Sequence, residues 1–482
     1  MFWRGVVGYL PANLVQGVTG LLTIVAFTRL LTPQAYGVYA LAFSVMSLVH
    51  TCLFVWLEAS MARFYAPESD AGRLPAHFAT LYRAEAVFGL VAPTAGGAIL
   101  SLLPVGHDLK IAIGAGLLAI PLRSLAKMIQ ERRRAAGEVR ASAALDMAQS
   151  GGAFLIGLAL AWAGLGGASP LLGLGGAALL CVLWTLPKEL CHAPGGAFEI
   201  DRARAYAGYG LPVALSLILA LALATTDRFL IAGYLGEASV GVYHAGYSLS
   251  NRTLDVLFIW LGMAGGPAAI AALERGGKAA LTAQAREQAS LMLLVCVPAA
   301  VGLALVARPL ADVMVGPDLR EGAARVTPWI AASGLFAGLT TYYFHTAFTL
   351  ARRTGLLLAA MAAPAAVNIG LCLVLIPSYG LSGAMWATTA SYGVGLLASF
   401  ALGRRVMPLP IPWDTLWRCA VAAAAMAAAV LALPAFGGVV ELLLKAAAGA
   451  VIYAAVAFLL DAGGARQQSS RLIRMAQARS AA

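Results

Sequence analysis

A small polar cluster interrupts a long apolar run near the middle of the chain. Asn251, Arg252 and Asp255 stand together between apolar neighbours on both sides. If the run spans a membrane, a charge within it costs at least about 2.5–3.5 kcal/mol, so it should face protein or water and serve a function. The planar guanidinium of Arg252 can donate two parallel hydrogen bonds to a phosphate. The cluster therefore predicts either a functional site at Arg252 or a structural Arg252–Asp255 pair.

Other charges at the outer ends of apolar runs allow two interpretations each. Asp227 and Arg228 are adjacent near the end of one run. They could line a polar cavity or act as an ion-coupling pair, or they could extend to the lipid headgroups as an interfacial pair. Arg29 ends the first apolar run, where an interface anchor is the simpler interpretation.

Two further sites carry groups that could capture an anion or move a proton. Arg123 and Lys127 lie in the inner part of one apolar run and could bind substrate, or could only signal membrane topology. His345 and His50 could relay protons because imidazole titrates near neutral pH. A single histidine inside a helical bundle is, however, more often a hydrogen-bonded packing residue.

The composition determines what must carry these side chains. The chain is 61% hydrophobic and 11% charged over 482 residues, whereas soluble proteins carry about 25% charged residues. In lipid only helices and closed barrels satisfy the backbone, and apolar runs of about 20 residues without alternation favour helices. We predict an all-α integral membrane protein with about fourteen transmembrane helices. They lie near residues 7–29, 37–57, 81–103, 109–128, 142–164, 170–187, 207–234, 240–262, 289–308, 327–350, 355–376, 381–402, 415–434 and 439–460.

The basic residues predict the orientation of these spans. With the N-terminus in the cytoplasm, 24 of the 33 Lys and Arg residues fall on cytoplasmic segments, six fall on outer loops, and three lie inside spans. This asymmetry is what the positive-inside rule requires, so both termini should be cytoplasmic. It also accounts for the net charge of +11, and nucleic-acid binding is therefore not expected. The six scattered cysteines predict no metal site, and no cofactor motif is present.

An internal repeat links the two halves of the chain. Residues 37–39 and 241–243 both read Gly-Val-Tyr, and residues 53–57 (LFVWL) match residues 257–261 (LFIWL) at the same offset, without a gap. A duplicated, membrane-embedded chain is typical of a transporter that is built from two related halves.

Three segments carry a resemblance to a known family. They are residues 28–40 (TRLLTPQAYGVYA), residues 227–232 (DRFLIA) leading to the second Gly-Val-Tyr, and residues 368–384 (NIGLCLVLIP, then YGLSGA after Ser378). Together they resemble oligosaccharide flippases of the polysaccharide transport family, relatives of multidrug and toxin extruders and of lipid II flippases.

The resemblance implies an architecture and a function. It implies a first lobe at residues 1–205, a pseudo-symmetric second lobe at 206–405, two further helices at 406–462, and a basic cytoplasmic tail at 463–482. Such a protein would carry polyprenyl-pyrophosphate-linked oligosaccharide from the inner to the outer leaflet by alternating access, for O-antigen, capsule or exopolysaccharide assembly. The resemblance also favours Arg252 as a phosphate anchor. It implies that Arg29 could lie at the edge of a gate.

The resemblance also implies where the protein works and with what. The expected location is a bacterial inner membrane, and the expected partners are the lipid-linked substrate, membrane lipids, a glycan polymerase and glycosyltransferases. A monomer is the expected state, and no enzymatic activity is expected.

Alternative functions remain open from the sequence. A cation-coupled multidrug extruder has the same topology, but such extruders place an acidic residue deep in an early helix, and the run at 7–29 has none. A lipid II flippase is a further possibility. A membrane glycan polymerase is the least favoured, because the longest outer connector, at about 309–326, carries only three acidic residues.

Overall fold

The computed structural model describes residues 2–191, 195–464 and 466, and within these residues it contains helices and irregular connections but no strand. Eleven of the helices are long and apolar enough to cross a membrane. The prediction of an all-α, multi-pass membrane protein is confirmed. Of the predicted basic tail at 463–482, only residues 463, 464 and 466 are within the described part of the chain.

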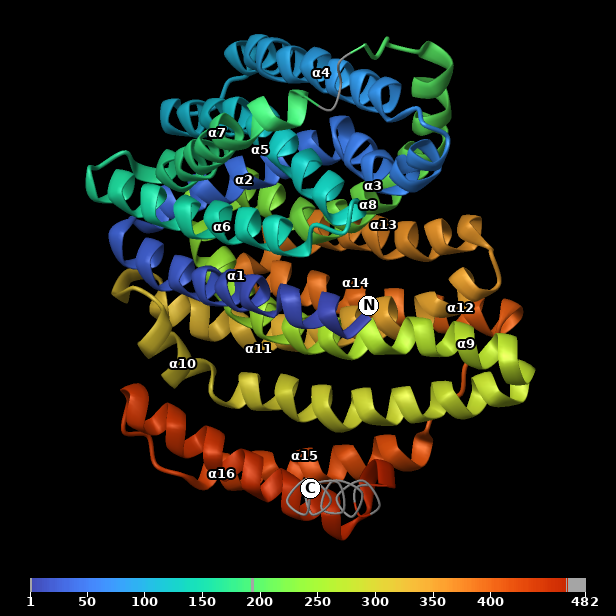
Figure 1. Cartoon of the computed structure of the whole chain (residues 1–482). Coiled ribbons are helices and arrows are strands. Elements are labelled where there is room, and N and C mark those ends of the chain that lie inside the picture. The colour runs from blue at the N-terminus through green and yellow to red at the C-terminus, as the bar shows by residue number, and fades with distance from the viewer. Residues whose placement is uncertain (1, 192–194, 465, 467–482) are drawn as a thin grey trace, which may run out of the picture. The chain divides into compact units, whose positions relative to one another are not determined.

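The chain divides into two compact units, Met1–His244 and Ala245–Ala482. The helices of the first unit, shown from blue to green in Figure 1, are α1 (Phe2–Leu30), α2 (Pro33–Leu53), α3 (Val55–Asp70), α4 (Leu74–Leu102), α5 (His107–Ala135), α6 (Val139–Trp162), the 3-10 turn η1 (Gly166–Ala168), α7 (Ser169–Leu190), α8 (Ile200–Leu235) and the opening turns of α9.

The second unit holds most of α9 (Glu237–Leu305) and every later helix. These are α10 (Ala307–Met314), α11 (Pro317–Leu339), the π-helix η2 (Thr340–Phe344), α12 (His345–Leu350), α13 (Thr354–Tyr379), α14 (Leu381–Val406), α15 (Trp413–Ala432), α16 (Gly438–Leu459) and the 3-10 turn η3 (Ala462–Gly464).

Helix α9 explains part of the difference between eleven and fourteen spans. It is 69 residues long, but Gly277 has a non-helical conformation (φ 65°, ψ −157°) that only glycine adopts readily. The chain turns back there (Figure 1), so the two arms of α9 correspond to the predicted spans 240–262 and 289–308. The predicted spans 327–350 and 381–402 coincide with α11 to α12 and with α14, which are helical but carry more polar residues.

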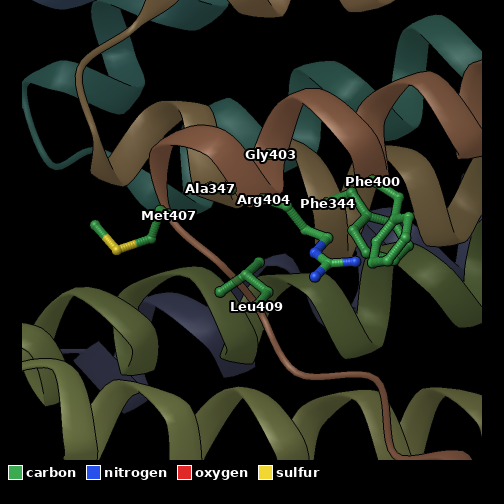
Figure 2. Close-up of a pocket in the computed structure, with 7 residues that line it drawn as sticks. All are labelled: Phe344, Ala347, Phe400, Gly403, Arg404, Met407 and Leu409. Atoms are coloured by element: carbon green, nitrogen blue, oxygen red, sulfur yellow. The ribbon is translucent and has the colours of Figure 1, made fainter.

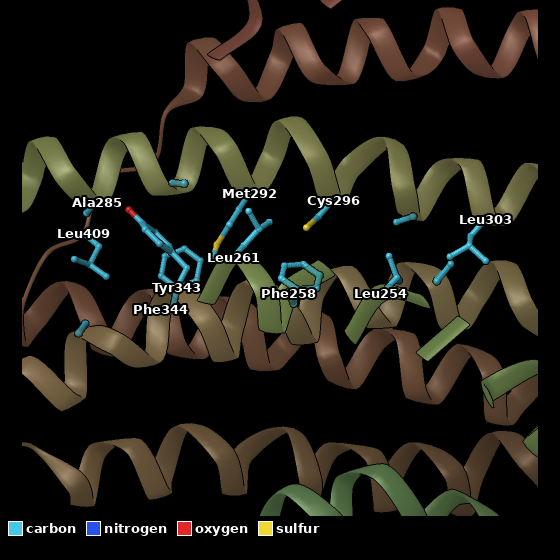
Figure 3. Close-up of a cluster of buried hydrophobic side chains, with 14 residues drawn as sticks. Leu254, Phe258, Leu261, Ala285, Met292, Cys296, Leu303, Tyr343, Phe344 and Leu409 are labelled. Carbon is cyan, nitrogen blue, oxygen red and sulfur yellow. The ribbon is translucent and has the colours of Figure 1, made fainter. Parts of the chain in front are cut away.

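A buried apolar cluster fixes how the first arm of α9 is rotated. Leu254, Phe258 and Leu261 repeat at helical spacing and face Met292 and Cys296 of the second arm (Figure 3). Tyr343 and Phe344 of η2 complete the same cluster. Because this stripe points into the second unit, the residues between its members must lie on the other faces of the arm.

The two copies of the sequence repeat meet each other inside the first unit. A Cβ atom on Gly37 of α2 would lie 1.8 Å from the carbonyl oxygen of Glu237, and one on Gly241 would lie 2.1 Å from that of Pro33. Positions 33 and 37 are the repeat equivalents of 237 and 241, so the contact is reciprocal. Each Gly-Val-Tyr glycine lets α2 and α9 approach backbone to backbone, as small residues do between membrane helices.

This crossing gives a prediction for stability. We expect Gly37→Ala to destabilise the protein by about 1–3 kcal/mol, the usual cost of overpacking, because its methyl group would overlap a backbone oxygen. Gly233→Ala on α8 is the matched control, since nothing lies within 4 Å of its Cβ position. Thermal unfolding of the detergent-solubilised protein measures the stability of both variants. Equal unfolding midpoints for the two variants would contradict the close crossing.

Buried ion pairs join the ends of α5 and α7. Arg132 donates from Nε and Nη2 to the two carboxylate oxygens of Glu189, at 2.8 and 2.6 Å, and Arg133 donates to the same carboxylate at 3.0 Å. The Glu189 side chain is 1% exposed. Arg132 also donates to Glu138 at 2.6 Å. This forked pairing holds the two helices in one register and thereby sets which face of α5 looks into the bundle.

Candidate functional site

The first unit contains a polar cavity of about 310 Å³. It is bounded by α1, α2, α3, α5, α6 and α7. Nine of its ten lining side chains are polar: Gln16, His50, Glu58, Arg123, Lys127, Gln130, Asp146, Gln149 and Ser150, with Leu174 as the apolar member. A polar space of this size among membrane helices holds water or a hydrophilic ligand.

One wall of the cavity is a row of hydrogen-bond donors on α5. Arg123, Lys127 and Gln130 are spaced i, i+4, i+7 and therefore share one helical face. Lys127 Nζ donates to Gln130 Oε1 at 3.0 Å and lies 3.6 Å from Glu131. We refer to Arg123, Lys127 and Gln130 as the α5 wall.

Some hydrogen-bond donors of the α5 wall lack a strong acceptor. Arg123 Nη1 donates to the Met46 thioether at 3.7 Å, a weak acceptor, and no ion pair involves Arg123 in the part of the chain that the structure describes. Gln130 is fully buried, and its Nε2 has no hydrogen-bond partner. The remaining guanidinium donors of Arg123, next to the Lys127 ammonium, suit a ligand group with acceptor oxygens.

The polar side chains of α6 that line the cavity can accept hydrogen bonds. Asp146, Gln149 and Ser150 lie on one face of α6, at i, i+3 and i+4. We refer to these three residues as the α6 wall. At the end of the cavity the buried Glu58 carboxylate bonds the His50 Nε2 atom at 2.9 Å.

Asp227 and Arg228, which the sequence singled out, lie elsewhere in the first unit. Both side chains are buried rather than extended to the surface. The Tyr243 hydroxyl donates to Asp227 Oδ2 at 2.6 Å, and Arg228 Nη1 donates to Ser44 Oγ at 3.2 Å. These bonds connect α8 to the repeat segments on α2 and α9.

The predicted Arg252 cluster is in the second unit, on the first arm of α9. Arg252 and Asp255 are exposed on faces turned away from the buried Leu254 stripe, because position 252 lies about 200° around the helix from position 254. Asn251 Nδ2 donates to Asp255 Oδ2 at 2.5 Å. Arg252 is not among the residues that line the cavity of the first unit.

The remaining candidates have local partners. Arg29 is exposed in the last turn of α1 and donates to the Val25 carbonyl oxygen at 2.8 Å. His345 follows the π-helical turn η2, and its Nε2 lies 3.3 Å from Ser399 Oγ on α14. Within residues 2–191, 195–464 and 466, no group of three or more His, Cys, Asp or Glu side chains is arranged to hold a metal ion.

Sequence reasoning missed most of the cavity. Of the ten residues that line it, the sequence identifies Arg123, Lys127 and His50 as candidates. The sequence does contain a signal for the cavity. Polar residues recur at i, i+4 and i+7 on α5 and at i, i+3 and i+4 on α6, within otherwise apolar runs.

An apolar crevice in the second unit contrasts with this cavity. Figure 2 shows it between Phe344, Phe400, Met407 and Leu409, with the Arg404 guanidinium beside the Phe400 ring, 5.4 Å from its centre. Its lining offers a cation and hydrocarbon, and the Met407 thioether is a weak acceptor.

Comparison with known families now identifies the chain. A model of the polysaccharide biosynthesis protein family matches residues 26–321, more than half of the sequence. The chain belongs to this family. None of the curated proteins compared with the chain matches it in sequence. The family predicted from residues 28–40, 227–243 and 368–384 is therefore confirmed.

Solved structures show which fold this member of the polysaccharide biosynthesis protein family adopts. The chain is similar to the lipid II flippase MurJ in an inward closed conformation, with a TM-score of 0.75 at 13% identity, covering 94% of this chain and 98% of that one. It is also similar to an inward-facing multidrug resistance MATE transporter of the MOP superfamily, with a TM-score of 0.70 at 13% identity, covering 81% and 94%. A MOP transporter from Pyrococcus furiosus gives 0.56 at 12% identity, covering 83% and 92%. The chain therefore has the MOP transporter fold.

Proposed function

We propose that this chain is a flippase that moves polyprenyl-pyrophosphate-linked oligosaccharide units from the cytoplasmic to the outer leaflet by alternating access, for O-antigen, capsule or exopolysaccharide assembly. The observation that carries the proposal is the α5 wall. The Arg123 guanidinium, which makes no ion pair with any residue that the structure describes, and the Lys127 ammonium line one side of a polar cavity in the first unit. Membership of the polysaccharide biosynthesis protein family supports the same class of substrate.

The α5 wall suits a pyrophosphate on energetic grounds. A pyrophosphate offers several charged oxygens, and each hydrogen bond to a charged group contributes about 1.5–3 kcal/mol. Arg123 and Lys127 present charged donors from one helix face, so one anion can bond both of them. These contacts can offset part of the loss of hydration that the anion suffers on leaving water.

The lining also distinguishes the proposal from drug export. Sites for drug-like molecules are mostly apolar and aromatic with a few polar groups, whereas this cavity has one apolar side chain among ten. A lipid II flippase carries the same pyrophosphate chemistry, and the α5 wall alone suits both substrates. The experiment below separates them.

The orientation that the basic residues predict places the cavity on the loading side. With both termini cytoplasmic, α5 runs inward and α6 runs outward, so Arg123 to Gln130 and Asp146 to Ser150 fall in the cytoplasmic half of a bacterial inner membrane. Glycosyltransferases would supply the substrate on that side, and a glycan polymerase would consume it on the other. The proposed partners thus follow from the direction of transport.

The test is transport by the purified protein in lipid vesicles. Vesicles carrying lipid-linked oligosaccharide, lipid II or a cationic dye would be compared, and arrival of each glycan in the opposite leaflet would be followed by its accessibility to an added glycosidase. We expect transfer of the oligosaccharide at least tenfold faster than in protein-free vesicles. Selective transfer of lipid II, or dye transport alone, would overturn the proposal.

Arg252 on α9 gives a second test, in the second unit. We propose that it contributes a further phosphate anchor, because it is exposed and the neighbouring Asp255 carboxylate accepts a hydrogen bond from Asn251. Arg252→Ala should abolish surface glycan at normal protein level, and Arg252→Lys should restore it partly, since an ammonium lacks the two-pronged geometry. Arg286→Ala, an exposed arginine on the other arm of α9, is the control. Normal glycan display by Arg252→Ala would disprove this role.

A further inference from the structure

Helix α14 of the second unit has one buried face and one exposed face. Ser391 and Ser399 lie on the buried face. At about 100° per residue, the exposed positions on the other side of the helix fall within roughly 60° of one another. They are Trp386, Ala390, Leu397, Ala401 and Arg404. We refer to these five residues as the α14 stripe.

The α14 stripe has the length and the end residues of a lipid-facing surface. From Trp386 to Arg404 it extends about 27 Å, at 1.5 Å per residue, which is close to the roughly 30 Å of the hydrocarbon core of a bilayer. Tryptophan and arginine both favour the membrane–water interface, and the stripe residues between them are apolar. With both termini cytoplasmic, as the basic residues predict, α14 runs inward and Arg404 lies at the level of the inner-leaflet phosphates.

The Arg404 guanidinium is held by an aromatic ring and keeps its hydrogen-bond donors available. Its central carbon lies 5.4 Å from the centre of the Phe400 ring (Figure 2). The ring covers one face of the guanidinium, whereas the N–H donors lie in the guanidinium plane. Among the residues that the structure describes, the side chains of Arg404 and its exposed neighbour Arg405 form no hydrogen bond and no ion pair. Two adjacent cations are therefore available to an anion from outside the chain.

The Phe400 ring that supports Arg404 belongs to the apolar crevice of the second unit. This crevice leaves no room for a water molecule, so a ligand would bind at the exposed edge of Arg404 and not inside the crevice. The Tyr343 hydroxyl donates to the Pro410 carbonyl oxygen and thereby attaches the connection between α14 and α15 to η2. Because this support is formed without a ligand, little ordering of the protein is needed for binding.

An anionic phospholipid has the chemistry that this surface requires. Its phosphate can accept hydrogen bonds from Arg404 and Arg405, and an acyl chain can lie along Leu397 and Ala401. A zwitterionic lipid brings its own cation to the same place, which weakens the attraction. A soluble anion has no hydrocarbon that could cover the stripe. Basic residues at the cytoplasmic ends of transmembrane helices bind acidic lipid headgroups by this charge complementarity.

We propose that Arg404 and Arg405 form a binding site for an anionic phospholipid of the inner leaflet, with its phosphate on the two guanidinium groups and one acyl chain along the α14 stripe. The bound lipid would cover the mouth of the crevice and stabilise the junction of α14 with the segment that leads to α15. This site does not depend on which substrate the protein moves.

The experiment measures lipid binding to the purified full-length protein in a neutral detergent by native mass spectrometry. Phosphatidylglycerol and phosphatidylcholine with identical acyl chains are added together, and the ratio of the two bound lipids is recorded. We expect a preference for phosphatidylglycerol of at least about tenfold, since each arginine contributes about fivefold. Arg404→Ala should reduce the preference about fivefold, and Arg404→Ala with Arg405→Ala should reduce it to less than about twofold. Arg275→Ala, which removes an exposed arginine just before the turn of α9, is the control and should leave it unchanged.

A further variant and two competitors complete the test. Phe400→Leu keeps both arginines but removes the ring under Arg404, so it should lower the preference without abolishing it. Wild-type preference in the variant that lacks both arginines, or an equal loss in Arg275→Ala, would disprove the site. Displacement of phosphatidylglycerol by inorganic phosphate would show a simple anion site instead. Displacement by farnesyl phosphate at lower concentration than by phosphatidylglycerol itself would assign the surface to a polyprenyl carrier and also overturn the proposal.

Discussion

Surface glycan should fall at least tenfold when Arg123 is replaced by alanine, with the amount of protein in the membrane unchanged. The guanidinium can bond two phosphate oxygens, and each charge-assisted bond contributes about 1.5–3 kcal/mol, equivalent to roughly a tenfold to hundredfold loss of affinity per bond. Because Arg123 makes no ion pair among the described residues, its removal leaves no buried carboxylate uncompensated. The variant should therefore fold normally and fail at the binding step.

Two variants make this expectation specific. Arg123→Lys keeps the charge but loses the planar fork, and it should retain a fraction of the glycan. Arg140→Ala removes an exposed arginine from the start of α6 and should leave glycan display unchanged. Quantification of cell-surface glycan in a strain that depends on this protein provides the measurement. If the Arg123→Ala variant displayed a normal amount of surface glycan, the α5 wall would not be part of the transport path.

Replacing Glu189 by alanine should destabilise the first unit by about 3–5 kcal/mol. The carboxylate accepts from Arg132 through two bonds and from Arg133 through a third, and its side chain is 1% exposed. Removing it leaves the buried Arg132 cation with only the partly exposed Glu138 as a partner, and breaking a buried pair from one side carries a penalty of this size. The expected result is a lower thermal midpoint in detergent and less protein in the membrane.

An exposed glutamate provides the comparison. Glu321 pairs with Arg325 on the surface of α11, with both side chains largely solvent-exposed, so Glu321→Ala should change stability by less than about 1 kcal/mol. Glu189→Gln should fall between the two, since the amide oxygen still accepts one bond from Arg132. Similar midpoints for the Glu189 and Glu321 variants would show that the buried network contributes little.

The sequence predicts features that depend on short segments, but not features that depend on contacts between distant helices. The spans were predictable because the bilayer requires each crossing segment to be a continuous apolar helix, and this requirement is local in sequence. The structure adds detail that no hydropathy pattern contains. Gly277 folds one 69-residue helix back on itself, and Gly37 and Gly241 bring the two repeat copies into direct contact.

The candidate site is less predictable for a physical reason. Arg123 and Lys127 could be identified as cations within an apolar run. The α6 wall, however, lies on a different helix, and it shares the cavity with α5 only because of how the helices are rotated against each other. That rotation is set by tertiary packing, including the Arg132–Glu189 pairing and the close contacts of small residues. Asp227 shows the same dependence, since its hydrogen bond to the Tyr243 hydroxyl exists only where α8 packs against α9.

The sequence by itself determined that the chain is a helical membrane protein with a duplicated segment, and it indicated the family through short motifs that survive divergence. The tertiary structure decided which polar residues share the cavity of the first unit. The difference arises because lipid solvation acts on each helix separately, whereas a binding site exists only after several helices have packed in one rotational setting.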